Sequence, residues 1–231
     1  MIDFHSHILP CMDDGSRSVD ESIGMLKSLS EQGIETVVAT PHFYANDESV
    51  SDFIARRQSS LEMLEESLTP DLPQILTGAE VKYYEGISRM PDLKSLCIQG
   101  THILLIEMPM RRWTEYVVKE LVDISCSGNV TVLLAHVDRY LKFQHSGIAE
   151  YLLANDIMMQ MNAEYICNFA TRHKALGLLK KHTIHVLGSD CHNMTDRRPD
   201  IGKAYEVIRK KFGNDFLIGF NDFGKNFLSD I

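Results

Sequence analysis

Short apolar runs alternate along the chain with longer segments in which apolar residues recur at helical spacing. Buried strands are predicted at Met1–His5, Ile34–Ala39, Gln74–Thr77, Ile103–Ile106, Val130–Ala135, Ile157–Met161 and Ile184–Leu187. Helices are predicted between Ser18 and Gly33, and at Asp52–Leu68, Thr114–Cys126, Ile148–Asn155, Lys174–His182 and Ile201–Phe212. This alternation is typical of a parallel α/β protein. We expect a distorted TIM-like (β/α) barrel of about seven strands.

The first predicted helix has the clearest boundaries. Ser18 and Glu21 form a capping box at its start, and Gly33 closes it. The sequence contains no low-complexity tract, fixed repeat or Pro/Gly/Ser-rich linker, so residues 1–231 are expected to form a single domain.

Composition and charge exclude several classes of protein. The formal net charge of -9 would repel a phosphate backbone, so nucleic acid is not an expected partner. The longest apolar runs are too short to cross a bilayer, and the opening residues do not resemble a secretory signal. We therefore expect a soluble, cytoplasmic protein without membrane insertion. Its five cysteines include no Cys-x-x-Cys pair, which argues against a disulfide framework and a thiolate zinc site.

Potential metal ligands follow six of the seven predicted strands. They are His5, His7, His42, Glu80, Glu107, His136, Asp190 and His192. Asp13 and Asp14 lie in the first loop, whereas the sixth strand ends in Asn162 and Glu164. Because the carboxyl ends of barrel strands meet on one face, these side chains are expected to gather there.

The mixture of ligand types indicates which ions would suit the site. His5 and His7 sit two residues apart on an extended segment, so both rings point to one side. Imidazoles mixed with carboxylates suit zinc, manganese or iron better than calcium or magnesium. Glu107 directly follows an apolar run, where a nearby cation would offset the cost of burying its charge.

Each of these residues also has an ordinary structural interpretation. A lone His-x-His pair is more often coincidence than a site, Glu80 and Glu107 could be ordinary carboxylates, and Asp190 could cap a turn. The joint pattern favours the metal site. The remaining histidines lack such a context and are interpreted as surface or structural: His102, His145, His173, His182 and His185.

Several short sequence motifs together resemble those of the polymerase and histidinol phosphatase (PHP) superfamily. They are His5-Ser6-His7, Leu9-Pro10-Cys11-Met12-Asp13-Asp14-Gly15-Ser16, Thr40-Pro41-His42, Gly78-Ala79-Glu80, Ile106-Glu107-Met108, Ala135-His136-Val137-Asp138-Arg139-Tyr140 and Gly188-Ser189-Asp190-Cys191-His192-Asn193. Within the superfamily, the chain is most similar to the manganese-dependent protein-tyrosine phosphatases of bacterial capsule and exopolysaccharide operons. The resemblance covers residue 2 to about residue 200.

The resemblance implies three divalent ions, with Mn²⁺ expected and Zn²⁺, Co²⁺ or Fe²⁺ as alternatives. The first ion would be held by His5, His7, Glu80 and Asp190, the second by Glu80, Glu107 and His136, and the third by Asp14, His42 and His192. Two positions depart from the family pattern. Cys11 stands where a small residue is common, and Asp138 stands where Glu is usual.

Arginines are the expected phosphate contacts, because a guanidinium can bind two phosphate oxygens at once. We choose Arg139 and Arg197, each a few residues after a candidate ligand, with Arg198 as the alternative to Arg197. A hydroxide held by the metals would attack phosphorus, and a phenolate could leave without a dedicated acid. Tyr44 and Tyr140 could line the mouth of the site or could be structural.

The sequence also contains two Cys-x5-Arg patterns, from Cys11 to Arg17 and from Cys191 to Arg197. This is the bare pattern of cysteine-dependent tyrosine phosphatases, which need a thiolate of low pKa. Aspartates beside both cysteines would instead raise the thiol pKa, so we do not expect cysteine catalysis.

Three functions from different classes remain. The first is a protein-tyrosine phosphatase acting on a bacterial tyrosine kinase or a regulator of polysaccharide synthesis, as the resemblance implies. The second is a phosphatase for a small metabolite such as histidinol phosphate. The third is a metal-binding protein without turnover, which the complete set of nine candidate ligands disfavours. The shape of the pocket would separate the first two, because a protein substrate needs an open site.

Overall fold

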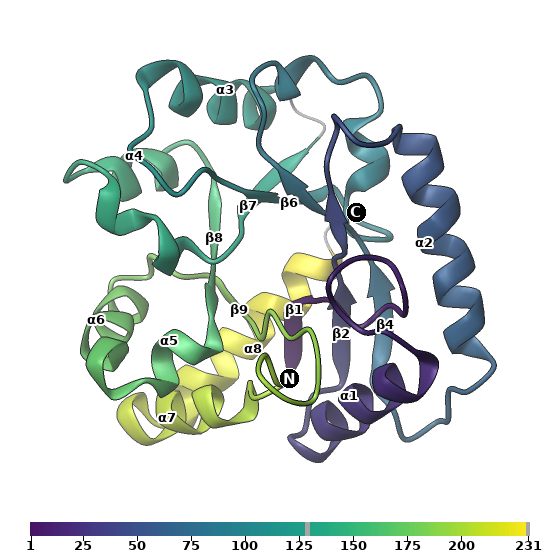
Figure 1. The fold of residues 1–231 in the computed structure, drawn as a ribbon. Coiled ribbons are helices and arrows are strands. Elements are labelled where there is room, and N and C mark those ends of the chain that lie inside the picture. The colour runs from purple at the N-terminus through teal and green to yellow at the C-terminus, as the bar shows by residue number, and fades with distance from the viewer. Residues whose placement is uncertain (128–129, 230–231) are drawn as a thin grey trace.

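The strands in the computed structural model, which describes residues 1–127 and 130–229, pair only in parallel (Figure 1). They are β1 Ile2–Ser6, β2 Thr36–Ala39, β3 His42–Phe43, β4 Gln74–Thr77, β5 Glu80–Lys82, β6 Ile103–Glu107, β7 Thr131–Leu134, β8 Met158–Asn162 and β9 Val186–Gly188. Ladder hydrogen bonds join them in the orders β1-β2-β4 and β3-β5-β6-β7-β8-β9. All seven predicted strands are present.

Two short strands, β3 and β5, were not predicted because each is only two or three residues long. Strand β3 follows β2 along the chain after a short break, and β5 follows β4 in the same way. Pro41 lies in the first break and has no N–H for the ladder. Backbone hydrogen bonds nevertheless cross the gap: Gly78 N–H donates to Ala39 C=O at 2.8 Å, and Glu80 N–H donates to Pro41 C=O at 3.0 Å. These breaks bring His42 and Glu80 into register as paired neighbours.

The first and last strands approach each other at their carboxyl ends. Ser6 and Cys191 form an isolated parallel bridge, and Asp190 N–H donates to His5 C=O at 2.8 Å. His7 N–H donates in turn to Cys191 C=O at 2.9 Å. The predicted parallel α/β class is confirmed, whereas a complete barrel of seven strands stays a prediction.

Eight α-helices occur in the described residues and surround the strands (Figure 1). They are α1 Val19–Glu31, α2 Val50–Glu65, α3 Glu115–Cys126, α4 Ile148–Leu153, α5 Ala163–Cys167, α6 Phe169–Lys180, α7 Gly202–Phe212 and α8 Asn214–Ser229. The predicted N-cap is confirmed, because Ser18 Oγ accepts the Glu21 N–H, but the return bond of the capping box differs: Glu21 Oε2 accepts the Arg17 N–H rather than that of Ser18. None of these helices is long and apolar enough to cross a membrane.

Helix α8 was not predicted, although its signal is in the sequence. Phe216, Phe220, Phe223 and Phe227 recur at helical spacing, and α8 follows α7 with only Gly213 between them. Helix α6 also begins at Phe169, five residues before the predicted start, because Asn168 caps it by accepting the Ala170 N–H.

The core has two parts. The larger lies between the strands and the surrounding helices, and the smaller is formed by inward side chains of the strands together with α8. The smaller part consists of Ile2, Phe4, Val38, Ile98, Ile103, Leu105, Leu133, Ala135, Val186 and Phe227. On β6, Ile103 and Leu105 alternate with outer-core residues, which puts Glu107 on their inward side at the strand end.

The packing of Phe227 against Phe4, at 6.3 Å between ring centroids, predicts that α8 contributes strongly to stability. Phe227→Ala should lower the free energy of unfolding by about 3 kcal/mol, because it leaves a cavity under β1. Urea denaturation measures the change. Ile218→Ala on the same helix removes a side chain that is 57% exposed and should change stability by less than about 0.5 kcal/mol. Equal losses in the two variants would contradict this role.

Candidate metal centre

The carboxyl ends of the strands bring all nine predicted ligands to one place. His5 lies on β1, and His7 and Asp14 lie in the loop that follows it. His42 lies on β3, Glu80 on β5 and Glu107 on β6. His136 is the second residue after β7, and Asp190 and His192 lie in the loop after β9. His136 adopts a left-handed backbone conformation with φ of 30° as the chain turns into the short 3₁₀ helix Val137–Arg139.

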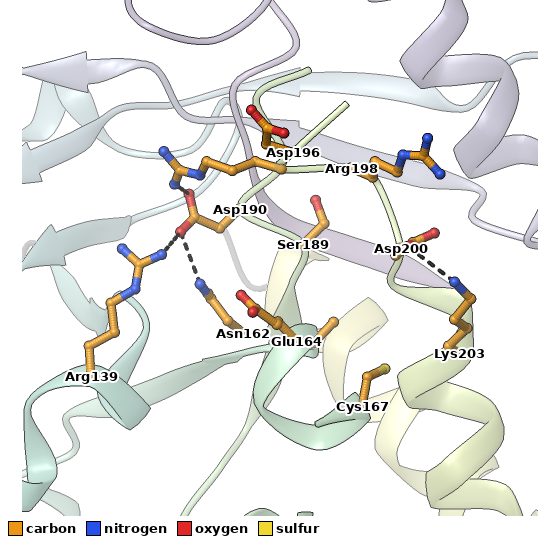
Figure 2. Close-up of a pocket in the computed structure, with 12 residues that line it drawn as sticks. Arg139, Asn162, Glu164, Cys167, Ser189, Asp190, Asp196, Arg198, Asp200 and Lys203 are labelled. Atoms are coloured by element: carbon orange, nitrogen blue, oxygen red, sulfur yellow. Dashed lines mark hydrogen bonds and ion pairs between the residues drawn. The ribbon is translucent and has the colours of Figure 1, made fainter. Parts of the chain in front are cut away.

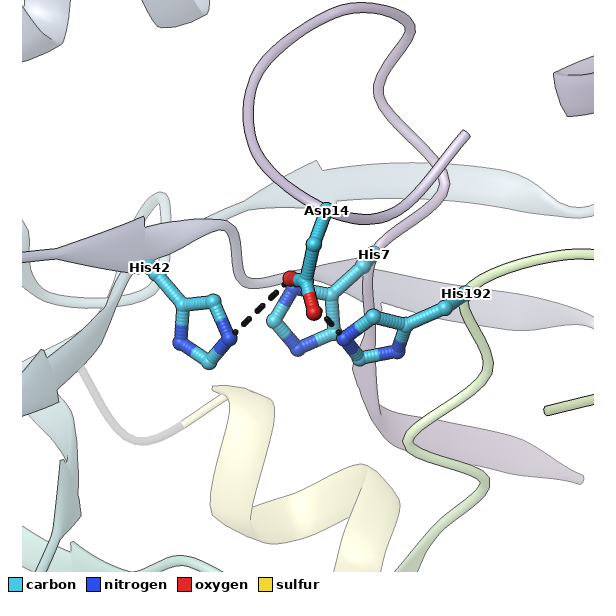
Figure 3. Close-up of side chains that lie close together, drawn as sticks. All are labelled: His7, Asp14, His42 and His192. Atoms are coloured by element: carbon cyan, nitrogen blue, oxygen red, sulfur yellow. Dashed lines mark ion pairs between the residues drawn. The ribbon is translucent and has the colours of Figure 1, made fainter. Parts of the chain in front are cut away.

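The potential ligands form three groups in which the ligand atoms lie within 4.8 Å of one another. The groups are His5, His7 and Asp190; Glu80, Glu107 and His136; and His7, Asp14, His42 and His192. Figure 3 shows the last group, with Asp14 above three imidazoles. The grouping resembles the sets implied by the resemblance, with two differences: His7 also belongs to the third group, and Glu80 is not a member of the first.

Glu80 lies at the centre of the three groups. Its Oε1 is 2.8 Å from His136 Nε2, and its Oε2 is 2.8 Å from His42 Nδ1. The same Oε2 is 3.4 Å from the Nε2 atoms of both His5 and His7. A carboxylate in this position is able to bridge neighbouring cations, as expected from the sequence.

Some buried polar atoms of the site lack a hydrogen-bond partner among the described residues, and their arrangement suits bound cations. Within the described part of the chain, the buried Glu80 Oε2 has no hydrogen-bond partner, although three imidazoles approach it. The buried His192 Nε2 also lacks one, although Asp14 Oδ1 lies 3.3 Å away. Unpaired buried polar atoms are costly, and lone pairs that converge without bonding each other are satisfied by a shared ion. The nitrogen and oxygen donors suit a transition metal such as manganese or zinc.

Electrostatics support the same conclusion. Burial opposes the charge of His7, but Asp13 and Glu80 outweigh it and raise the pKa of His7 to about 10. Burial and the neighbouring cations His7 and Arg197 lower the pKa of His192 to about 4, which leaves its ring neutral. His5, Arg139 and His7 hold the pKa of the Asp190 carboxyl well below its usual range despite burial. The Asp190 carboxylate therefore stays ionised and attracts positive charge, which divalent cations would supply in place of protons.

Asp13 has a role that the sequence analysis missed. Its Oδ2 accepts a hydrogen bond from His7 Nδ1 at 2.7 Å and from the His42 N–H at 2.8 Å, while its Oδ1 accepts the Gly15 N–H at 2.9 Å. A carboxylate on the far nitrogen of a ligand histidine fixes the ring orientation. The only sequence signal for this role was the adjacent Asp13-Asp14 pair in the first loop.

The two predicted phosphate arginines lie beside Asp190. Arg139 Nη2 donates to Asp190 Oδ2, and Arg197 Nη2 donates to Asp190 Oδ1 at 2.6 Å. Both line a cavity of about 250 Å³ next to the metal groups (Figure 2). Arg198 lines the same cavity, but its Nε donates to the backbone of Met194 and Thr195, whereas Arg197 contacts Asp190.

The surroundings of Tyr140 and Glu107 could not be assigned from the sequence alone. Of the two alternatives for Tyr140, the structural one holds: it is completely buried, contacts Trp113 and donates its hydroxyl to Ala135 C=O. Glu107 has a cation beside it, because Lys82 Nζ lies 2.6 Å from its Oε2. Tyr44, in contrast, is 38% exposed, and its ring centroid is 5.5 Å from that of His42.

The other polar residues singled out in the sequence stay outside the three groups. Among the described residues these groups contain no further histidine, as expected for His102, His145, His173, His182 and His185. Cys191 is buried, and burial with Asp3 and Asp190 nearby raises the pKa of its thiol. Cys11 is exposed and donates its thiol to Arg17 C=O. Neither cysteine has the environment of a reactive thiolate.

The fold and the site together define a parallel α/β protein with a candidate multi-ion centre at its strand ends. The family model described as "Capsular polysaccharide synthesis, CpsB/CapC" matches residues 1–220, so the chain belongs to this family. It is 29% identical to tyrosine-protein phosphatase YwqE of Bacillus subtilis, over 93% of this chain and 86% of the relative. It is also 29% identical to tyrosine-protein phosphatase CpsB of Streptococcus agalactiae, over 93% and 92%.

A solved structure has the same fold. It belongs to the crystal structures of YwqE from Bacillus subtilis and CpsB from Streptococcus pneumoniae, described as unique metal-dependent tyrosine phosphatases. The TM-score is 0.82 at 24% sequence identity, and the match covers 100% of this chain and 96% of that one.

The contact between the first loop and His7 predicts that Gly15 is required for the site. A Cβ atom at residue 15 would lie 2.3 Å from His7 C=O oxygen, so Gly15→Ala must displace the loop or His7. We expect about tenfold weaker Mn²⁺ binding by isothermal titration calorimetry. Gly177→Ala, where no atom lies within 4 Å, is the matched control and should bind Mn²⁺ normally. Normal binding by the Gly15→Ala variant would show that the loop adapts.

Proposed function

We propose that this chain is a metal-dependent protein-tyrosine phosphatase formed by one PHP-type domain over residues 1–231. The observation that carries the proposal is the convergence of nine imidazoles and carboxylates in three ligand groups. Membership of the CpsB/CapC family and the names of the relatives YwqE and CpsB support the choice of substrate. The substrate would be a phosphotyrosine protein in the cytoplasm, such as a bacterial tyrosine kinase or a regulator of polysaccharide synthesis.

The proposal includes three divalent ions, with Mn²⁺ as the metal. The sets are those described above, and Glu80 would be shared between the first two ions. Bound ions would neutralise phosphate charge and lower the pKa of coordinated water. The bridge between Ser6 and Cys191 supports a distorted barrel of seven strands around this centre.

The arginines of this chain would bind and orient the phosphate. Arg139 and Arg197 stand on either side of Asp190 at the edge of the site, and both side chains are partly exposed. Their guanidinium groups can donate two parallel hydrogen bonds to phosphate oxygens. Asp190 would hold both arginines in place and keep them at the boundary between the ions and the solvent.

The surroundings favour a phosphate carried on a protein. Asp14 is 64% exposed, so the third group opens directly to solvent and a bulky substrate can reach it. Tyr44 stands beside His42 and offers a ring face on which a substrate phenyl ring could pack. The acids and imidazoles of the three groups would bind metals, and Asp13 accepts hydrogen bonds from His7 and His42. None of these described residues is then free to donate a proton, which favours a phenolate leaving group.

Substrate selectivity tests this proposal. We expect kcat/KM for a phosphotyrosine peptide to exceed that for the matched phosphoserine peptide by at least about 100-fold, because phenolate, with a conjugate-acid pKa of about 10, is the better leaving group. The assay compares both peptides and histidinol phosphate at saturating Mn²⁺, with EDTA-treated enzyme as the control. Faster turnover of histidinol phosphate would favour the metabolite phosphatase. Metal binding without turnover of any substrate would favour the non-catalytic protein.

The ligand and phosphate roles should separate by metal content. His136→Ala should lose bound metal and lower kcat by orders of magnitude, because it removes a ligand that contacts Glu80. Arg139→Ala should keep its metal and lose affinity for phosphate. Elemental analysis and steady-state kinetics measure the two effects. Wild-type kinetics in Arg139→Ala, or wild-type metal content in His136→Ala, would refute the assigned role.

A further inference from the structure

Strand β8 differs from its neighbours β7 and β9, because no histidine or carboxylate on it or directly after it belongs to the three ligand groups. Its sequence, Met158–Asn162, nevertheless carries two amides, at Gln160 and Asn162. Both side chains are buried, and they lie two residues apart, so they face the same side of the strand. Buried amides need partners, and the partners of these two lead to the metal ligands.

Gln160 contacts two histidines of the site through one atom. Its Oε1 accepts the backbone N–H of His136 at 2.7 Å and lies 3.2 Å from His5 Nδ1. The His136 backbone N–H can only donate, so the amide oxygen must face it. His5 Nδ1 must then carry the proton and donate to the same oxygen. The lone pair of His5 is thereby placed on Nε2, the atom that faces His7 and Glu80.

The other half of the Gln160 amide extends the chain of hydrogen bonds. Gln160 Nε2 donates to Asn162 Oδ1 at 2.9 Å, which leaves Asn162 Nδ2 to donate to Asp190 Oδ2 at 2.9 Å (Figure 2). Asp190 Oδ2 is held there together with Arg139, and Oδ1 lies 3.7 Å from His5 Nε2. The two amides therefore connect residues of three other strand ends, those of β1, β7 and β9.

Two further features hold this arrangement in place. Asp138 Oδ1 accepts the Asn162 N–H at 3.0 Å, which gives a function to the aspartate that replaces the family's usual glutamate. Gly188 on β9 leaves the space that the amides occupy, because a Cβ there would lie 2.8 Å from Gln160 Nε2 and 2.5 Å from His5 Cβ. The packing thus accommodates Gln160 only next to a glycine.

We infer that Gln160 and Asn162 form an amide relay that positions His5, His136 and Asp190 for metal binding. Gln160 sets the tautomer of His5 and the backbone position of His136, and Asn162 orients the Asp190 carboxylate. We treat both as positioning residues, because their amides bond to the ligands themselves: Gln160 to the His5 ring and the His136 backbone, and Asn162 to the Asp190 carboxylate. The inference rests on the proposed function, since it concerns the same ligands. The alternative is that the two amides only stabilise the fold.

Mn²⁺ affinity separates the relay from a purely structural role. We would measure Mn²⁺ binding by isothermal titration calorimetry for the wild type, Gln160→Met, Asn162→Leu and the double variant. Each single variant should bind Mn²⁺ about 10- to 100-fold more weakly, the usual cost of removing a partner of a metal ligand. The double variant should lose little more than Gln160→Met alone, because Asn162 depends on Gln160 for its orientation.

Gln32→Met is the matched control. Gln32 also bonds through both halves of its amide, to Pro199 C=O and Gly202 N–H, but joins α1 to α7 outside the three ligand groups. The Gln32→Met substitution should lower the melting temperature measured in EDTA and leave the Mn²⁺ affinity unchanged. Circular dichroism checks that each variant is folded. Asn162→Ser replaces any variant that is not folded, and we expect it to bind Mn²⁺ about tenfold more weakly than the wild type.

Wild-type Mn²⁺ affinity in folded Gln160→Met and Asn162→Leu would overturn the relay. A loss of Mn²⁺ affinity in Gln32→Met as large as that in the relay variants would overturn it too. Strictly additive losses in the double variant would refute the coupling between the two amides. These results are independent of the phosphatase assay. If the wild type hydrolyses phosphotyrosine and the variants bind Mn²⁺ normally, only the relay is rejected. If the variants bind Mn²⁺ more weakly but the wild type has no phosphatase activity, only the proposed function is rejected.

Discussion

Glu80 is a buried carboxylate whose oxygens lie within 3.4 Å of four imidazole rings, and the rest of the site depends on how its charge is compensated. An isolated carboxylate in such a place would be strongly destabilising. The parallel sheet brings the compensating histidines to this carboxylate. Each strand ends at the same face, so histidines that are far apart in the sequence meet around one acidic group without long loops.

Much of the fold and the site could be predicted from the sequence, because both depend on regular patterns. Apolar runs identified all seven longer strands, and the ligands followed them at the expected end. What could not be predicted depends on local geometry. β3 and β5 are too short to give a periodic signal, and only the backbone reveals that Pro41 and Gly78 interrupt longer lines of pairing. The position of Tyr140 after Arg139 was compatible with the mouth or with the core, and only the structure shows that it lies buried after the 3₁₀ turn.

The outer contacts of the ligands were harder to anticipate than the ligands themselves. Gln160 belongs to no ligand motif, and nothing in sequence spacing places it next to His5, 155 residues away. A polar residue within an otherwise apolar strand was nevertheless a signal, since it had to find a partner on burial. Lys82 beside Glu107 was missed because β5 itself was missed.

The three ligand groups differ in their distance from solvent. Asp14 and His42 stand at the boundary, whereas Glu80, His136 and Asp190 are enclosed by protein. An ion at the outer group would exchange with bulk solution faster than those behind it, because water can replace its ligands one at a time. Dialysis would therefore strip the ions in sequence, and a purified sample would carry a fractional load whose stoichiometry reflects its handling history.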